Sequence, residues 1–146
     1  MSEKKGMVTF YCDGLIEPRN PGGFACWGWV ALADSGNQIA TDCSCVGHGD
    51  GMTNNIAEYW AFINAATWAL MHHPDKPVTY RTDSKLVVEQ VNGRWKVNSD
   101  QLRPLADLAR HLLTETGGIL EWVPREQNTI ADALSRRAYR RATGQK

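Results

Sequence analysis

Four acidic residues occupy places in the sequence where a charge has little structural purpose: Asp13, Glu58, Asp83 and Asp132. Glu58 lies in a long apolar segment, where a buried carboxylate costs several kcal/mol unless it has a partner. Carboxylates gathered in one place repel one another unless cations hold them, and oxygen-only ligand sets select Mg²⁺ or Mn²⁺ over zinc or copper. If the fold brings the four together, the chemistry that they imply is metal-assisted displacement at phosphorus. One ion would activate water and a second would stabilise the leaving oxygen.

The sequence predicts secondary structure that alternates between strands and helices. β-branched and aromatic residues dominate 7–13, Gly36-Asn37 is a hairpin signal, and residues 55–71 are helix formers that are apolar nearly all round. The elements expected in chain order are strands over 7–13, 24–33 and 37–46, a helix over 55–71, a strand over 78–82, a helix from Asp83 or Ser84 to about 92–93, a helix over 99–115, a strand over 119–123 and a helix from Asn128 or Thr129. This order predicts an α/β fold, with a mixed sheet flanked by helices.

This layout places the four acids near one another. Asp13 is expected to end the first strand before a turn at Gly14, and Asp83 to follow the fourth strand. If these strands are neighbours, the helix starts that carry Glu58 and Asp132 meet them at one edge of the sheet. The alternative for Asp83 and Asp132 is compensation of a helix dipole, worth about 0.3–1 kcal/mol each. That alternative accounts for neither Asp13 nor Glu58.

Length and composition limit the classes of protein that fit. The chain has 146 residues, enough for a single domain expected over 1–146 with an ordered core of about 7–140. Its 42% hydrophobic and 22% charged residues are typical of a globular protein. The longest uncharged apolar stretch, 24–33, is shorter than the roughly 20 residues of a membrane helix. Because no apolar core of a signal peptide follows the N-terminus, we expect a cytoplasmic protein with no membrane contact. We also expect it to be a monomer.

Charges are segregated along the chain, although sixteen Lys and Arg balance sixteen Asp and Glu. Residues 20–75 contain five acids and no Lys or Arg, whereas residues 76–146 carry thirteen basic residues against eight acids. A set of metal-binding acids and a basic half that faces phosphates together account for this segregation. Net neutrality therefore does not exclude a nucleic-acid partner.

The four cysteines, at positions 12, 26, 43 and 45, are expected to be reduced because no secretory signal is evident. Cys43, Cys45 and His48 offer an alternative, a zinc site, but they lack a second pair of ligands. Alternate positions on a strand explain the spacing of the two cysteines equally well. The long helix is expected to take Thr53 or Asn54 as its N-cap and to end at His72-His73-Pro74.

A spaced set of motifs covering roughly residues 7–140 resembles the type 1 ribonuclease H family. These motifs are Asp13-Gly14, Asn20-Pro21-Gly22-Gly23, Thr53-Asn54-Asn55-x-Ala57-Glu58, Thr82-Asp83-Ser84 and Asn128-x-x-Ala131-Asp132-x-Leu134. The resemblance implies a ribonuclease H-like fold with a five-stranded mixed sheet. It also implies an enzyme that cleaves the RNA strand of RNA–DNA hybrids and leaves 3′-hydroxyl and 5′-phosphate ends.

Carried over position by position, the resemblance makes the four acids the ligands of two Mg²⁺ ions, for which Mn²⁺ can substitute, with Asp13 bridging both. It implies that Asn20 and Asn55 contact 2′-hydroxyls of the RNA strand, the groups that separate RNA from DNA. Thr53 and Asn98 resemble a pocket for a phosphate of the DNA strand, and Asn128 a further substrate-binding position. Turn formation and helix capping are the structural alternative for these Asn and Thr residues.

Two departures from the family pattern stand out. Many members carry a long basic helix and loop after the second helix, whereas here Arg94-Trp95-Lys96 leads almost directly into the next helix. This segment is either a remnant that contacts the nucleic-acid backbone or a Trp that docks on the core. The loop before the last helix often supplies a histidine, and here it carries Arg125. Arg125 cannot act as a general base at neutral pH, but it can hold a phosphate or the leaving product.

Two other functions fit part of the sequence. Proofreading-type exonucleases of the same broad fold usually show a D-x-E pair on the first strand, whereas Asp13 is followed by Gly14-Leu15. A non-catalytic hybrid-binding module is expected to have lost at least one of the four acids, and all four are present. The sequence therefore favours a catalytic, hybrid-specific endoribonuclease.

Overall fold

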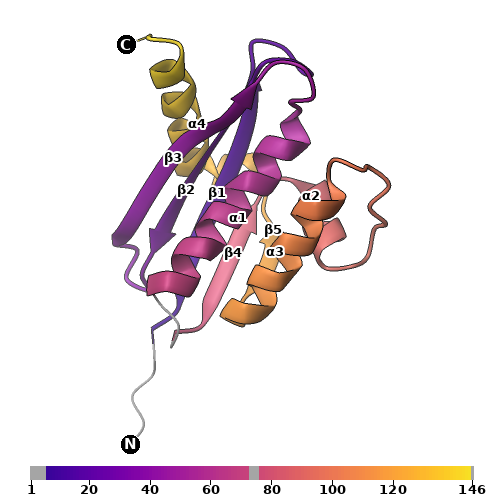
Figure 1. The fold of residues 1–146 in the computed structure, drawn as a ribbon. Helices are drawn as coiled ribbons and strands as arrows, with labels where there is room; N and C mark the ends of the chain where they lie inside the picture. Colours follow the sequence, from indigo (N-terminus) through magenta and orange to yellow (C-terminus); the bar gives the residue numbers. More distant parts are fainter. Residues whose placement is uncertain (1–5, 73–75, 146) are drawn as a thin grey trace, which may run out of the picture.

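A computed structural model, which describes residues 6–72 and 76–145, contains a five-stranded sheet in the order β3-β2-β1-β4-β5 (Figure 1). β1 (Val8–Glu17), β2 (Phe24–Leu32) and β3 (Gln38–His48) are antiparallel neighbours. β4 (Val78–Thr82) pairs in parallel with β1, and β5 (Ile119–Trp122) pairs in parallel with β4. The α/β fold with a mixed sheet is therefore confirmed.

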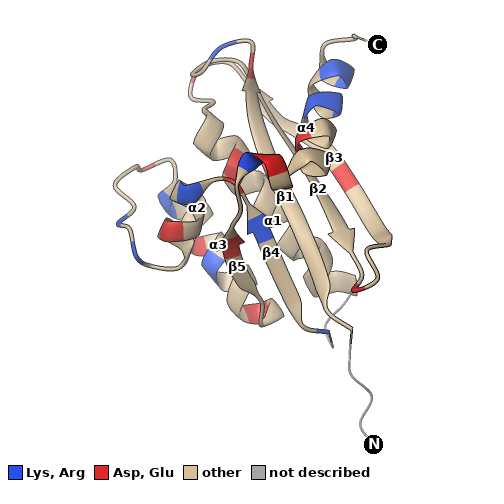
Figure 2. Ribbon diagram, turned by 180° about the vertical axis from the view of Figure 1, so that it is seen from behind, with Lys and Arg blue, Asp and Glu red and all other residues tan. Residues whose placement is uncertain are grey.

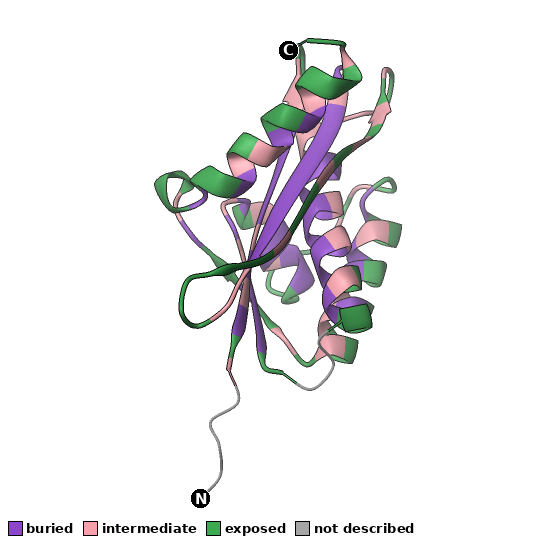
Figure 3. Ribbon diagram, turned by 90° about the vertical axis from the view of Figure 1, so that its left-hand side faces the viewer, coloured by how far each residue is buried: buried purple, intermediate pink, exposed green. Residues whose placement is uncertain are grey.

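Helices cover both faces of the sheet. α1 (Asn54–His72), α2 (Lys85–Val91) and α3 (Arg103–Thr116) lie on one side, and α4 (Thr129–Ala142) lies across the other (Figures 1 and 3). α1 is apolar nearly all round because it packs on β1 and β2 and also against α3. The core between the sheet and these helices is aromatic, with Phe10, Trp29 and Tyr80 almost completely buried.

β1 is longer than the sequence predicted, and Asp13 does not end it. β1 pairs with β4 only as far as Cys12 and Thr82, but its pairing with β2 continues to Glu17. Gly14, expected in a turn, is paired with Trp27 inside the strand. Asp13 therefore lies at the point where β1 loses one of its two neighbouring strands.

The predicted helices are present, with adjusted starts. α3 begins at Arg103 rather than at residue 99 because Pro104 lacks the N–H that the interior of a helix requires. Thr53 caps α1, since its Oγ1 accepts a hydrogen bond from the N–H of Ile56 at 3.2 Å, and Ser84 caps α2. α1 ends at His72. The predicted stop at 73–74 lies outside the described residues, and so do residues 1–5 of the N-terminus, which was expected not to be a signal peptide.

The prediction of four reduced cysteines is wrong for two of them. The antiparallel register places Cys26 of β2 directly opposite Cys45 of β3, and the two form a disulfide. Cys12 and Cys43 remain free thiols. The zinc alternative at Cys43, Cys45 and His48 is excluded as well, because the Cys45 sulfur is bonded to Cys26. Within residues 6–72 and 76–145, no helix combines the length and apolar character needed to cross a bilayer.

Candidate active site

The parallel register of β1 and β4 brings the first two acids together. Cys12 of β1 is paired with Thr82, the last residue of β4, so the residues that follow them, Asp13 and Asp83, lie at the same end of the pairing. Asp13 is 6% exposed, and the side chain of Asp83 is 10% exposed. The sequence-based prediction that these two acids meet at the end of neighbouring strands is thus correct, although β1 itself continues.

Glu58 reaches the same point from the helical face of the sheet. The start of α1 crosses β1 at Gly14, whose backbone N–H donates a hydrogen bond to Oε1 of Glu58. A Cβ on Gly14 would lie 2.3 Å from the carbonyl carbon of Ala57, so only glycine permits this approach. Glu58 is itself only 6% exposed. The close crossing of helix and strand therefore fixes this buried carboxylate beside Asp13.

Asp132 comes from the opposite face of the sheet, in the first turn of α4. Gly28 of β2 lets α4 approach, since a Cβ there would lie 2.6 Å from Cβ of Leu134. Asn128, just before the helix, donates from Nδ2 to the backbone carbonyl of Cys12 at 2.7 Å. This bond ties the start of α4 to the residue that precedes Asp13.

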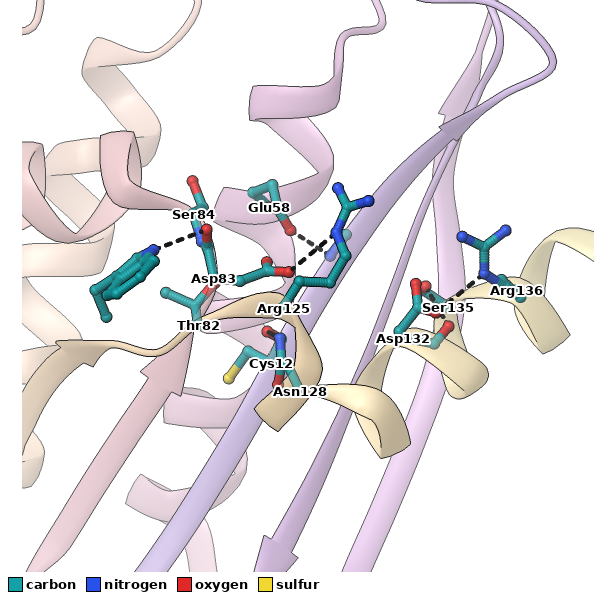
Figure 4. A network of polar contacts seen from close by, with 12 residues as sticks. Cys12, Glu58, Thr82, Asp83, Ser84, Arg125, Asn128, Asp132, Ser135 and Arg136 are labelled. Carbon is teal, nitrogen blue, oxygen red and sulfur yellow. Dashed lines mark hydrogen bonds and ion pairs between the residues drawn. The ribbon is translucent and has the colours of Figure 1, made fainter.

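The four acids do not form one symmetrical cluster. Carboxylate oxygens of Asp13, Glu58 and Asp83, which we call the acidic triad, all lie within 4.8 Å of one another. Asp132 is not a member of this group, and its Oδ2 accepts a hydrogen bond from Nε of Arg136 at 3.1 Å (Figure 4). Asp132 nevertheless interacts with Asp13, through a side-chain hydrogen bond and through its charge. Asp13 is thus the member of the triad whose side chain is in contact with that of Asp132.

Burial gives the triad an unusual titration. Burial, followed by the charges of Glu58 and Asp83, raises the pKa of Asp13 to about 10. Burial and the charge of Asp83 raise the pKa of Glu58 to about 8, against the hydrogen bond from Gly14 and the charge of Arg125. Burial also raises the pKa of Asp83. Without a cation, the triad therefore retains protons at neutral pH.

The triad fits a hard divalent cation. Its donors are all carboxylate oxygens, the set that Mg²⁺ and Mn²⁺ prefer, and their mutual spacing is compatible with one shared ion. A bound cation would relieve the mutual repulsion that raises the pKa of Asp13 and Glu58. Asp132 and Asp13 together offer carboxylate oxygens for a second ion.

The triad opens into a cleft of about 730 Å³, which we call the acidic cleft. Arg125, in the short 3₁₀ helix η1 (Arg125–Gln127), lies at its mouth with Nε 3.9 Å from Oδ2 of Asp83 and a side chain that is 88% exposed. Asn20 and Asn55 also line the cleft, and Oδ1 of Asn20 accepts a hydrogen bond from the N–H of Asn54. The structure therefore brings these three predicted residues to the same cleft as the four acids.

Two of the remaining predicted contacts have other partners. Asn128 is 1% exposed and donates to the carbonyl of Cys12, a bond that positions the start of α4, and its contact with a substrate stays a prediction. Arg94 is engaged with Glu89, with Nη2 of Arg94 2.6 Å from Oε1.

The other four do not line the acidic cleft. Thr53 caps α1, and Asn98 is exposed in the loop between α2 and α3, which reaches the turn before Thr53 through a hydrogen bond from Gln101 to the carbonyl of Gly51. Trp95, 44% exposed, and Lys96 line a separate groove of about 400 Å³ against α3, so Trp95 does not dock on the core.

The acidic cleft has further lining residues that were not named as site residues from the sequence, among them Trp122, Lys85 and Arg136. Trp122, 50% exposed at the end of β5, donates from Nε1 to the carbonyl of Asp83. Lys85 follows the Asp83-Ser84 motif, and Arg136 lies one helical turn beyond Asp132. The i, i+4 spacing from Asp132 was a usable signal for Arg136, whereas only the sheet order places Trp122 beside Asp83.

Known proteins resemble this chain along most of its length. Residues 13–138 match the family model described as "Reverse transcriptase-like". A protein named Ribonuclease HI from Halobacterium salinarum is 38% identical over 93% of this chain. The solved N-terminal RNase H domain of a Mycobacterium tuberculosis protein is 34% identical, with a TM-score of 0.83 over 94% of this chain and 96% of that one. LC11-RNase H1, solved in complex with an RNA/DNA hybrid, is 30% identical, with a TM-score of 0.83 over 93% of this chain and 99% of that one.

The mixed sheet, the helices on its two faces and the acidic triad beside the end of β4 define a protein of the ribonuclease H-like fold class. The relatives narrow this class, and the chain belongs to the type 1 ribonuclease H family. It spans 66% of the length of the Halobacterium protein and 31% of a mycobacterial relative named as a bifunctional protein. The segment that joins α2 to α3 contains no helix in the described residues, consistent with the predicted lack of a basic protrusion.

Proposed function

We propose that this protein is an endoribonuclease that hydrolyses the RNA strand of RNA–DNA hybrids and leaves 3′-hydroxyl and 5′-phosphate ends. The observation that carries the proposal is the buried acidic triad at the base of a polar cleft, with Asp132 on its far side. The presence of all four acids favours catalysis over a binding-only role. The choice of substrate is supported by the relative LC11-RNase H1, which was solved with an RNA/DNA hybrid bound.

In this proposal the four acids hold two Mg²⁺ ions, for which Mn²⁺ can substitute. When bound, such ions supply Lewis acidity that activates water and stabilises the leaving oxygen. Asp13 lies between Glu58 and Asp83 on one side and Asp132 on the other, so its carboxylate is the one suited to serve both ions. The N–H of Gly14 donates to the carboxylate of Glu58, and the side-chain amide of Asn128 donates to the carbonyl of Cys12, next to Asp13, so both bonds help to keep these carboxylates in place.

Other residues of the cleft orient the substrate. Asn20 and Asn55 lie at the start of α1 and supply amide groups for 2′-hydroxyls, which a DNA strand lacks. Arg125 cannot accept a proton, but its exposed guanidinium at the mouth of the cleft can hold a phosphate of the substrate or of the leaving product. We further propose that the chain acts as a single domain and as a monomer in the cytoplasm.

The test is a cleavage assay on four labelled substrates: an RNA–DNA hybrid, duplex DNA, single-stranded RNA and duplex RNA. With Mg²⁺ we expect cleavage only in the RNA of the hybrid, with 3′-hydroxyl products. Asp13→Asn should lower the rate by at least about 10³-fold, since several kcal/mol of charge stabilisation are lost, and should retain hybrid binding. Asp107→Asn, on an exposed acid of α3, is the matched control. Wild-type cleavage by Asp13→Asn contradicts the metal assignment, and exonucleolytic products contradict the endonuclease.

A further inference from the structure

A second groove adjoins the acidic cleft along α4. It has a volume of about 240 Å³ and lies between the end of β1 and the last turns of the helix. We call it the α4 groove, and its lining residues are Leu15, Glu17, Arg136, Tyr139, Arg140 and Gln145. Leu15, Glu17 and Arg136 also line the acidic cleft, so the two hollows share a wall. A ligand strand that leaves the cleft on this side enters the α4 groove.

The groove carries a stripe of cations that begins at a site carboxylate. Asp132, Arg136 and Arg140 are spaced by four residues, so they lie on one face of α4, each about 6 Å further along the axis. The basic residues occupy the C-terminal half of the helix (Figure 2). The stripe therefore leads from Asp132 in the first turn of α4 to positions about 12 Å away.

The two arginines of the stripe are not equivalent. Arg136 is held by Asp132, and the charges of Glu17 and Asp13 also act on it. In the described part of the chain, no carboxylate lies within ion-pair distance of Arg140, which is exposed. Compensation of the helix dipole, worth about 0.3–1 kcal/mol, applies equally to its neighbour Arg141 and does not explain why Arg140 lines a groove.

We propose that the α4 groove binds the sugar–phosphate backbone of the strand being cleaved, beyond the scissile phosphate, with Arg140 as its principal contact. The inference rests on the proposed function. Two observations select this occupant: the groove adjoins a cleft suited to a phosphate strand and shares three lining residues with it, and its unpaired cation is a guanidinium, which binds phosphate through two parallel hydrogen bonds. The site reads charge and backbone position, and it has no means of reading sequence.

The experiment uses a DNA strand with a fixed block of ribonucleotides, paired with complementary DNA, so that the cleavage position stays constant. The DNA flank is lengthened stepwise on either side, and KM, kcat and the dissociation constant without metal are measured. Arg140→Gln is compared with Arg137→Gln, which removes the same charge from the same helix but lies outside the groove lining. Arg140→Lys tests whether the forked geometry contributes beyond charge.

We expect lengthening one flank to tighten binding by wild type and by Arg137→Gln. Arg140→Gln should lose about tenfold in affinity for the longest substrate, mainly in KM, and should lower the salt dependence of binding by about one phosphate contact. Arg140→Lys should fall between. Equal effects of Arg140→Gln and Arg137→Gln, or no gain from either flank, would overturn the groove assignment even where the RNA is cleaved. Failure of wild type to cleave RNA refutes the proposed function instead, and the binding measurements still decide the role of the groove.

Discussion

Gly14 of β1 lies directly against the backbone of Ala57 in α1: a Cβ added to Gly14 would be only 2.3 Å from the carbonyl carbon of Ala57. This contact sets the height of α1 above the sheet. It also allows the Gly14 N–H to donate to Glu58, the residue after Ala57. The buried carboxylate and the strand that carries Asp13 are therefore fixed to each other by backbone atoms rather than by flexible side chains.

Gly14→Ala should destabilise the protein and weaken metal binding together. The added methyl group meets backbone, which cannot rotate away, so we expect a loss of about 3 kcal/mol in the free energy of unfolding. Urea unfolding measures the loss, and calorimetry with Mg²⁺ measures the binding. Gly6→Ala is the control, because its Cβ would lie at an ordinary contact distance of 3.5 Å from Oδ2 of Asp34. This substitution should change the free energy of unfolding by no more than about 0.5 kcal/mol. A normal Mg²⁺ affinity in a stable Gly14→Ala variant would contradict this account.

The metal-free protein should lose stability as pH rises. The pKa of Glu58 is raised from 4.5 to about 8 and that of Asp13 from 3.8 to about 10. Below about pH 4 both carboxyls are protonated in the folded and unfolded states. Between there and pH 8 the unfolded chain releases protons that the folded protein keeps, so the free energy of unfolding falls.

Thermal melting in EDTA should therefore give a lower Tm at pH 8 than at pH 5, and Mg²⁺ should raise the Tm more at pH 8, where protons compete less for the carboxylates. Asp13→Asn should flatten the pH dependence in EDTA, whereas Asp107→Asn should preserve it. A metal-free Tm that increases between pH 5 and pH 8 in the wild type and is unaffected by Asp13→Asn is the contrary result.

Arg125→Ala should slow hybrid cleavage by about tenfold or somewhat more, which corresponds to the loss of one charge-assisted hydrogen bond. Its charge also lowers the pKa of Glu58 and Asp83, so the variant should need a higher pH to reach its full rate. Steady-state kinetics from pH 6 to pH 9 provide the measurement. Arg125→Lys, which keeps the charge, should restore the pH profile but only part of the rate. An unchanged profile for Arg125→Ala would exclude an electrostatic role.

Reduction of the Cys26–Cys45 disulfide should lower the free energy of unfolding by about 3 kcal/mol, the scale expected for a loop of this length. Thiol titration of the denatured protein should find two free thiols before reduction, Cys12 and Cys43, and all four after it. Cys26→Ser should reproduce the loss without a reductant, and Cys43→Ser serves as the control. Four thiols in the unreduced protein would show that the pair is open.

The sequence by itself determined the type and order of the elements and the identity of the four acids. Hydrophobic periodicity, caps and turn residues are local signals, and they located α1, β4 and α4 to within a few residues. An acid such as Glu58 in an apolar helix is also a local anomaly, since burial of a charge requires a reason. The family motifs then added the roles of these acids.

Only the tertiary structure decided how far β1 extends, which cysteines pair, and which three of the four acids form the triad. Strand register sets the first two: Asp13 stays within β1 because β2 continues beside it, and Cys26 meets Cys45 because the β2–β3 pairing places them opposite each other. The third depends on α1 and α4 approaching the sheet from opposite faces at Gly14 and Gly28. Contacts between residues far apart in the chain produce all three, and no local pattern in the sequence encodes such distances.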